Sequence, residues 1–185
     1  MKFMRKECYH TGKSNTVQIT FTKVPNLSLF SAPSRRQIDS ALAVLRVVLG
    51  VTFILHGGQK LFVYGFDGVA GAFGQMGIPA PGFFGPFVGF VELFGGIAIV
   101  LGLLTRLAAL GVGSMMAVAI LTVHLKQGFF NPGGVEFPLA LLASAIALVI
   151  AGAGAYSVDS VIAKRLEGNV VADEVPARAG QRRAA

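Results

Sequence analysis

The 185-residue sequence has few charges where a soluble protein would need them most. Only 14% of its residues are charged and 54% are hydrophobic, whereas an average soluble domain carries about 25% charged residues. The 116 residues from 40 to 155 contain only seven charged side chains, which are Arg46, Lys60, Asp67, Glu92, Arg106, Lys126 and Glu136. This shortage argues against a soluble single domain and against a multidomain chain, because too little polar sequence remains to cover a surface.

Cysteine is almost absent as well. Cys8 is the single cysteine, which excludes an intramolecular disulfide framework, a CxxC redox pair and a cysteine-rich metal site. No metal site is predicted. The N-terminal segment before Pro33 lacks an apolar stretch of the length that a secretory signal needs. The net charge of +7 lies mostly in the two tails, where it bears on membrane orientation, and no nucleic-acid partner is expected.

Long hydrophobic runs are what the sequence has in abundance. A membrane-crossing helix needs about 20 predominantly apolar residues to span a hydrocarbon core of about 30 Å. Four stretches have that length and character, namely residues 41–62, 83–104, 107–125 and 137–155. None alternates with the period of two that a membrane β-barrel strand shows. The sequence therefore predicts an all-α integral membrane protein, with a bundle of four transmembrane helices in residues 38–156.

Local signals mark where these helices begin and turn. Ser34 and Gln37 have the spacing of a capping box, which predicts that the first helix begins at Arg35. The very short turn at residues 105–106 makes the second and third spans antiparallel neighbours. Residues 64–82 contain no basic side chain, and Asp67 and Gly77 are placed to begin and end a short helix there. We expect this helix to lie at the membrane interface between spans one and two, although a glycine-rich loop is the alternative.

Basic residues near the helix ends predict the orientation. One side of the membrane would carry Arg35, Arg36, Arg106, Lys164 and Arg165, and the other only Lys60 and Lys126. The positive-inside rule then places both termini in the cytoplasm. Residues 1–37 are expected to form a polar, basic tail without regular structure, apart from a weak alternation at residues 16–21. Residues 157–185 are expected to form a cytoplasmic tail, disordered from residue 172.

Polar residues inside the spans are the candidate functional residues, because ionisable groups at membrane depth are costly and usually face the interior of a bundle. One face of the first span carries, at helical spacing, Arg46, Gly50, Phe53, Gly57 and Lys60. This face should look into the bundle. Arg46 lies near the cytoplasmic end, so it either joins the interior or extends to the interface as an anchor.

At the helical rise of 1.5 Å per residue, a second set of residues is expected at one level in the outer half of the membrane. The set comprises His56, Lys60, Glu92, His124, Lys126 and Glu136. Glu92 most needs a partner, and Lys60 or His56 is the natural one. Three interpretations remain open: a purely structural polar clamp, a proton-relay or quinone-headgroup site, and a bis-histidine haem site. A quinone is the cofactor that such a cluster would suit, whereas two histidines alone are weak evidence for haem.

Several of these residues stand in a recognisable order. The chain has Leu45-Arg46 with Gly50, then His56-Gly57 with Lys60-Leu61-Phe62, then Val91-Glu92-Leu93 with Gly95-Gly96, then Gly102 and Thr105-Arg106. This pattern resembles the DoxX family of small membrane proteins over about residues 38–155. The resemblance implies a four-helix inner-membrane bundle and marks as family positions Arg46, Gly50, His56, Gly57, Lys60, Glu92, Gly95, Gly102 and Arg106.

The function that the resemblance implies is less specific than the fold. The family name comes from a subunit of a quinone-linked oxidoreductase system that acts on reduced sulfur compounds, and other relatives are linked to membrane redox complexes. We therefore expect a multi-pass protein of the bacterial inner membrane that is a non-catalytic subunit or anchor of a redox complex with protein partners. A small proton-coupled transporter that uses Glu92 and Lys60 is one alternative, and a purely structural subunit of a larger membrane assembly is another.

Overall fold

The computed structural model describes residues 4–9, 18–23 and 31–167. The chain divides into two compact units, Met1–Ser34 and Arg35–Ala185. Each unit is described by itself. The expectation for residues 172–185 lies outside the described residues.

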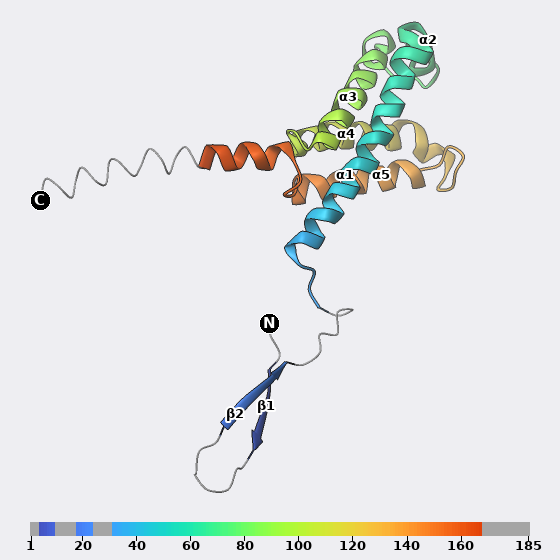
Figure 1. Cartoon of the computed structure of the whole chain (residues 1–185). Helices are drawn as coiled ribbons and strands as arrows, with labels where there is room; N and C mark the ends of the chain where they lie inside the picture. The colour runs from blue at the N-terminus through green and yellow to red at the C-terminus, as the bar shows by residue number, and fades with distance from the viewer. Residues whose placement is uncertain (1–3, 10–17, 24–30, 168–185) are drawn as a thin grey trace, which may run out of the picture. The chain divides into compact units, whose positions relative to one another are not determined.

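The N-terminal unit contains a β-hairpin. Strand β1 (Met4–Tyr9) pairs antiparallel with β2 (Gln18–Lys23), with Met4 opposite Lys23 and Tyr9 opposite Gln18 (Figure 1). The weak alternation at residues 16–21 overlaps β2, but β1 has no counterpart in the sequence reasoning. The expectation of a tail without regular structure is therefore wrong for these two strands.

The first long helix changes its form before it ends. Helix α1 (Arg35–Gly58) begins at the residue that the Ser34–Gln37 spacing predicts, and it continues as a π-helix, η1 (Gln59–Tyr64), and then as α2 (Gly65–Gln75). Gly65, with a φ of 68°, separates η1 from α2. Gly77, with a φ of 73°, lies just beyond α2, and the amide of Ile78 donates to the carbonyl of Phe73 at 3.0 Å. The predicted short helix is thus present, and it packs on the following helix.

Three further helices complete the bundle, and one of them carries two short extensions. They are α3 (Pro81–Leu101), α4 (Thr105–Ala119) with its extensions η2 (Ile120–His124) and η3 (Leu125–Gln127), and α5 (Glu136–Ala151). Among the described residues, the segments Arg35–Gln75, Pro81–Leu101 and Thr105–Gln127 are long and apolar enough to cross a membrane.

Two of the predicted spans end earlier than expected. Helix α5 is apolar but shorter than the predicted span, because Gly152, with a φ of 80°, ends it before residue 155. Helix α3 likewise ends before residue 104, at the left-handed Gly102. The structure is thus a helical membrane-type bundle with three long apolar helices and one shorter one.

Glycines set how closely α1 and α3 approach. A Cβ atom at Gly50 would lie 2.6 Å from the Gly96 carbonyl oxygen, and one at Gly57 would lie 2.7 Å from that of Gly89. The two members of each helix are seven residues apart, which is about 10.5 Å along an α-helix. Two antiparallel helices therefore touch backbone to backbone at two levels, as small residues allow in membrane helices.

The interior lies where this helix pair meets the pair formed by α4 and α5. Its fully buried residues come from all four helices, and they are Leu49, Phe53, Ile99, Ala109, Val112, Ala145 and Leu148. Gly95 serves this second contact, because a Cβ atom there would lie 2.9 Å from Cγ1 of Val112 on α4. The adjacent residues Gly95 and Gly96 of α3 thus face α4 and α1, respectively.

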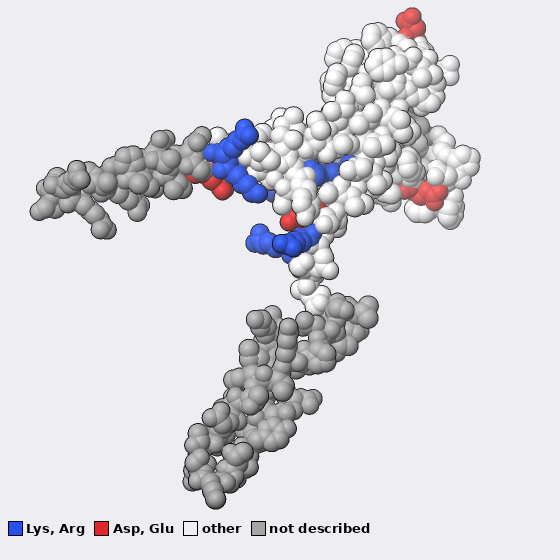
Figure 2. Space-filling view, viewed as in Figure 1, with Lys and Arg blue, Asp and Glu red and all other residues white. Residues whose placement is uncertain are grey.

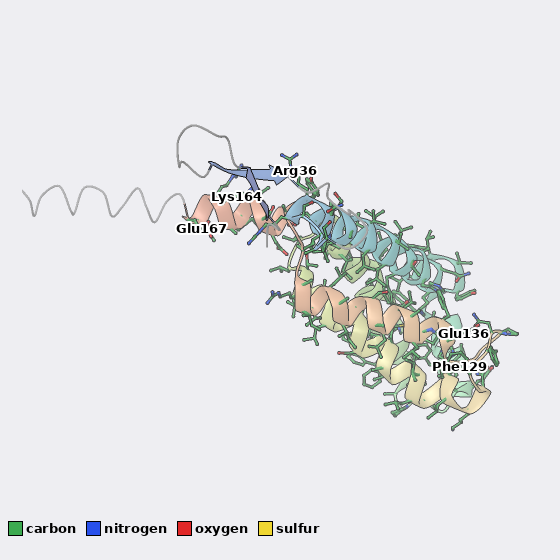
Figure 3. The ribbon with its side chains drawn as sticks, turned by 90° about the horizontal axis from the view of Figure 1, so that it is seen from below. Arg36, Phe129, Glu136, Lys164 and Glu167 are labelled. Atoms are coloured by element: carbon green, nitrogen blue, oxygen red, sulfur yellow. The ribbon has the colours of Figure 1, made fainter. Side chains whose placement is uncertain are left out.

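The outside of the helical unit is apolar, and its charges lie at its ends. Large side chains point away from the protein, among them Leu55, Phe62, Leu107 and Ile150, each more than 60% exposed, and Figure 2 shows wide uncharged surfaces. Figure 3 places Arg36 and Lys164 at one end of the unit and Phe129 and Glu136 at the other. An apolar belt between polar ends is the surface that a lipid bilayer requires.

Candidate functional site

A buried ion pair joins the first and second long helices. Lys60 of η1 donates from Nζ to Oε2 of Glu92 on α3. The Glu92 side chain is 3% exposed and that of Lys60 is 22% exposed. Glu92 is therefore paired with Lys60, one of the two partners that the sequence reasoning expected, and the Lys60 side chain stays partly accessible.

The ion pair lies at the wall of a cavity of about 300 Å³ between the helices. Four of the lining residues carry ionisable groups: His56, Lys60, Glu92 and His124. The walls are otherwise mainly apolar and aromatic, formed by residues such as Phe53, Phe73, Met76, Ile78, Val88, Met115, Met116, Phe137 and Leu141. A mostly apolar pocket with a few convergent polar groups is the usual form of a small-molecule site, although this one is at the small end of the usual range of about 300–1,000 Å³. Within the described part of the chain, no three His, Cys, Asp or Glu side chains gather as a metal site.

Two of the polar lining residues come from π-helical segments. Lys60 belongs to η1 and His124 ends η2. A π-turn inserts an extra residue into a helix and rotates the residues beyond it, and such turns are frequent at functional sites. The local backbone therefore sets where both side chains enter the cavity.

The two histidines are held differently. Nδ1 of His124 lies 2.6 Å from the carbonyl oxygen of Gly133, in the loop before α5. The His56 ring lies 6.3 Å from the ring of Phe137, centroid to centroid. His56 is largely exposed and makes no hydrogen bond within residues 31–167, whereas His124 is tied to the backbone.

Two members of the predicted six-residue cluster lie elsewhere. Lys126 is exposed on η3 and does not line the cavity. Glu136 accepts a hydrogen bond from the amide of Asn131 at 2.9 Å and stabilises the loop that precedes α5. The expected convergence of all six residues is therefore wrong for Lys126 and Glu136. The π-helical and 3₁₀ turns of η2 and η3 displace residues from the positions that uniform 1.5 Å steps assign.

The remaining family positions belong to the opposite end of the unit. Arg46 is 2% exposed and donates from Nη2 to the carbonyl oxygen of Tyr156. Gly102 makes room for it, since a Cβ atom there would overlap Nη1 of Arg46. Arg46 thus joins the interior and is not an interfacial anchor. Arg106, by contrast, is exposed and lies 3.4 Å from the carbonyl oxygen of Ile150.

Asp159 was missed by the sequence reasoning. Its carboxylate accepts hydrogen bonds from the amides of Leu104 at 2.7 Å and Thr105 at 2.9 Å, and so caps the N-terminus of α4. Asp39 of α1 accepts from the amide of Ala155 at 2.9 Å. We call Asp39, Arg46, Tyr156 and Asp159 the terminal clasp, because they join the start of α1, the start of α4 and the segment after α5. Residues 158–167, which belong to the stretch expected as a cytoplasmic tail, continue from it as a helix.

The pKa of Asp159 is lowered. Burial raises this pKa, but the amides of Thr105 and Leu104 and the positive charge of Arg46 together outweigh burial. The folded value therefore lies below the ordinary 3.8. The contribution of the Asp159 carboxylate to the stability of the fold is complete above the ordinary pKa of 3.8. It is lost as the pH falls through the lowered folded pKa.

Asp159→Ala should lower the free energy of unfolding by about 1–2 kcal/mol at pH 7, because two amides at the start of α4 lose their acceptor. Thermal melts followed by helical circular dichroism in detergent would measure this loss. The difference from wild type should shrink when the melts are repeated at about pH 3, because this pH lies below the ordinary pKa of 3.8 and the unfolded chain then binds the proton. Glu167→Ala, at an exposed position, is the control, and an equal loss in both variants would contradict the capping role.

The fold and the buried polar residues define a class: a small helical membrane protein with an ion-paired cavity. The family model for DoxX matches residues 41–125, and that described as "TQO small subunit DoxD" matches residues 86–175. The chain belongs to the DoxX family.

Curated relatives agree with this assignment. "Putative oxidoreductase CatD" of Bacillus subtilis is 34% identical over 74% of this chain and 98% of its own length. "Inner membrane protein YqjF" of Escherichia coli is 34% identical over 69% of this chain and 95% of its own. A membrane protein of Mycobacterium tuberculosis is 34% identical over 65% of this chain and 80% of its own. No solved structure matches the chain at a significant level.

Proposed function

We propose that the protein is the membrane subunit of a quinone-linked redox complex, and that its cavity receives a quinone headgroup. The observation that carries this proposal is the Lys60–Glu92 ion pair at the wall of an otherwise mainly apolar cavity. The subunit family named by the DoxD model and the relative named as an oxidoreductase support it.

The chemistry of the cavity suits a quinone ring. A quinone is a flat, apolar ring with carbonyl oxygens at its edge, and those oxygens accept hydrogen bonds. Lys60 is a cation with three N–H donors, of which one is directed to Glu92, so further donors are available to a ligand oxygen. Glu92 holds the ammonium group in place and balances its charge. The aromatic and methionine side chains of the walls contact the ring.

The distribution of charge supports a cytoplasmic location of both termini in a bacterial inner membrane. Arg36 and Lys164 lie at one end of the helical unit, as Figure 3 shows. Arg106 begins α4 beside the segment after α5, at that same end. The positive-inside rule assigns this end to the cytoplasm and the cavity to the outer half of the membrane.

A subunit role fits what the helical unit offers. It presents apolar side chains, short connections and a small cavity between its helices, so the electron donor or acceptor would be held by a partner protein. In this arrangement the chain anchors its partner and presents the quinone, and is not itself the catalyst.

Retention of quinone through purification tests the proposal. The protein purified in mild detergent should yield about one quinone per chain on lipid extraction and chromatography. The Lys60→Met/Glu92→Met double variant removes both charges together. It should retain at least about tenfold less quinone than the wild type, because the headgroup loses its hydrogen-bond donor. Lys126→Met, at an exposed lysine outside the cavity, should retain it.

Two other results would support a different function for the protein. Protein that contains no quinone and binds none on addition, yet still associates with a partner, would identify a structural subunit. Proton-coupled uptake into proteoliposomes that Glu92→Gln abolishes would identify a transporter.

A further inference from the structure

One hydrogen bond in the cavity wall determines which ring nitrogen of His124 carries a hydrogen. Nδ1 of the ring lies 2.6 Å from the carbonyl oxygen of Gly133. A carbonyl oxygen can only accept a hydrogen bond, so Nδ1 must carry a hydrogen and donate it. The neutral ring then carries no hydrogen on Nε2, which becomes a hydrogen-bond acceptor.

Nε2 of His124 has no partner within residues 31–167, and the residue lines the cavity. The cavity therefore offers an acceptor on His124 and donors on Lys60. Glu92 is the other charged group in the wall; its Oε2 accepts from Lys60, and its second carboxylate oxygen is a further acceptor. His56 has no hydrogen bond that selects one tautomer, so it can match either kind of ligand oxygen.

We propose that this site prefers the reduced, hydroxyl-bearing quinol to the oxidised quinone, and that His124 is the residue that sets the preference. This inference rests on the proposed quinone function. A quinol hydroxyl can donate to Nε2 of His124 while its other oxygen accepts from Lys60. A quinone has only acceptor oxygens, so it leaves Nε2 of His124 without a partner in a mainly apolar cavity, which is unfavourable.

Binding of a matched pair of ligands tests the preference. Duroquinone and duroquinol share a ring and differ by two hydrogens, and the titrations are done anaerobically at about pH 8. The wild-type protein should bind duroquinol about tenfold more tightly, as one net hydrogen bond predicts. His124→Phe should reduce this ratio to near one, whereas His56→Phe should keep it.

A second measurement determines the tautomer of His124 directly in the wild-type protein. Nitrogen-15 spectra of histidine-labelled protein distinguish a protonated from an unprotonated ring nitrogen at each site. The sequence has only three histidines, so the His124 signals can be assigned from those that disappear in His124→Phe or, if it does not fold, from those that remain in His56→Phe and His10→Phe. The expected spectrum shows hydrogen on Nδ1 and none on Nε2 at this pH.

The outcomes separate this inference from the function on which it rests. If neither ligand binds, the proposed function fails. If both bind with equal affinity, or if His56→Phe and not His124→Phe removes the preference, quinone binding stands and the assignment to His124 is overturned. Hydrogen on Nε2 of neutral His124 would overturn it as well.

Discussion

Lys60→Met should lower the free energy of unfolding by about 3–5 kcal/mol, because it leaves the Glu92 carboxylate buried without its partner. Breaking a buried pair from one side costs more than the pair contributes, since the remaining charge stays out of water. The side chain of Glu92 is 3% exposed, so water can replace only a small part of what the ammonium group provides. The loss would be measured by titrating the protein in mild detergent with a denaturing detergent and following helical circular dichroism.

The double variant makes this expectation specific to the pair. Lys60→Met/Glu92→Met should recover most of the loss, because two apolar side chains replace two charges in an apolar wall. Lys126→Met should change stability by less than about 0.5 kcal/mol, as an exposed substitution does. A double variant no more stable than Lys60→Met would show that the lysine contributes through packing alone and not through its charge.

Gly57→Ala should lower the free energy of unfolding by about 3 kcal/mol, at the upper end of the cost of overpacking. The added Cβ atom would overlap the amide nitrogen of Leu93 and would lie 2.7 Å from the carbonyl oxygen of Gly89. Both are backbone atoms of α3, so the methyl group can be accommodated only if the two helices move apart. The same denaturing-detergent titration would measure the change.

Gly71→Ala on α2 is the matched control. A Cβ atom there would meet no atom within 4 Å, so alanine should leave stability unchanged or raise it by up to about 1 kcal/mol through its higher helix propensity. If both alanine variants behave alike, the close contact between α1 and α3 does not determine stability. Separation of these helices would also move Lys60 away from Glu92, so Gly57→Ala should lose bound quinone as well.

The sequence predicted most of the helical unit, because the signals involved are local. Hydrophobic length located the four helices, and the spacing of Arg46, Gly50, Phe53 and Gly57 identified the face of α1 that is buried. The partner of Glu92 was also predictable, since an acidic group at that depth has few cations to choose from. These inferences need only the regular geometry of an α-helix.

The sequence-based predictions fail where the chain departs from regular α-helical geometry. A π-helix or a 3₁₀ turn has no simple signature in composition, so the placement of Lys126 in the cluster came from a uniform helix that η2 and η3 do not form. Asp159 was missed for a different reason. It lies 55 positions beyond Leu104, and an acceptor that caps a helix from so far along the chain cannot be found by local spacing.

The terminal clasp also sets the order in which the molecule can be completed during synthesis. Asp39 and Arg46 lie on α1, but their partners Ala155 and Tyr156 come only after α5. The start of α4 likewise waits for Asp159. A nascent chain can therefore insert its helices α1 to α5 while Arg46 still lacks its acceptor, and only a chain synthesised past this segment reaches its finished form.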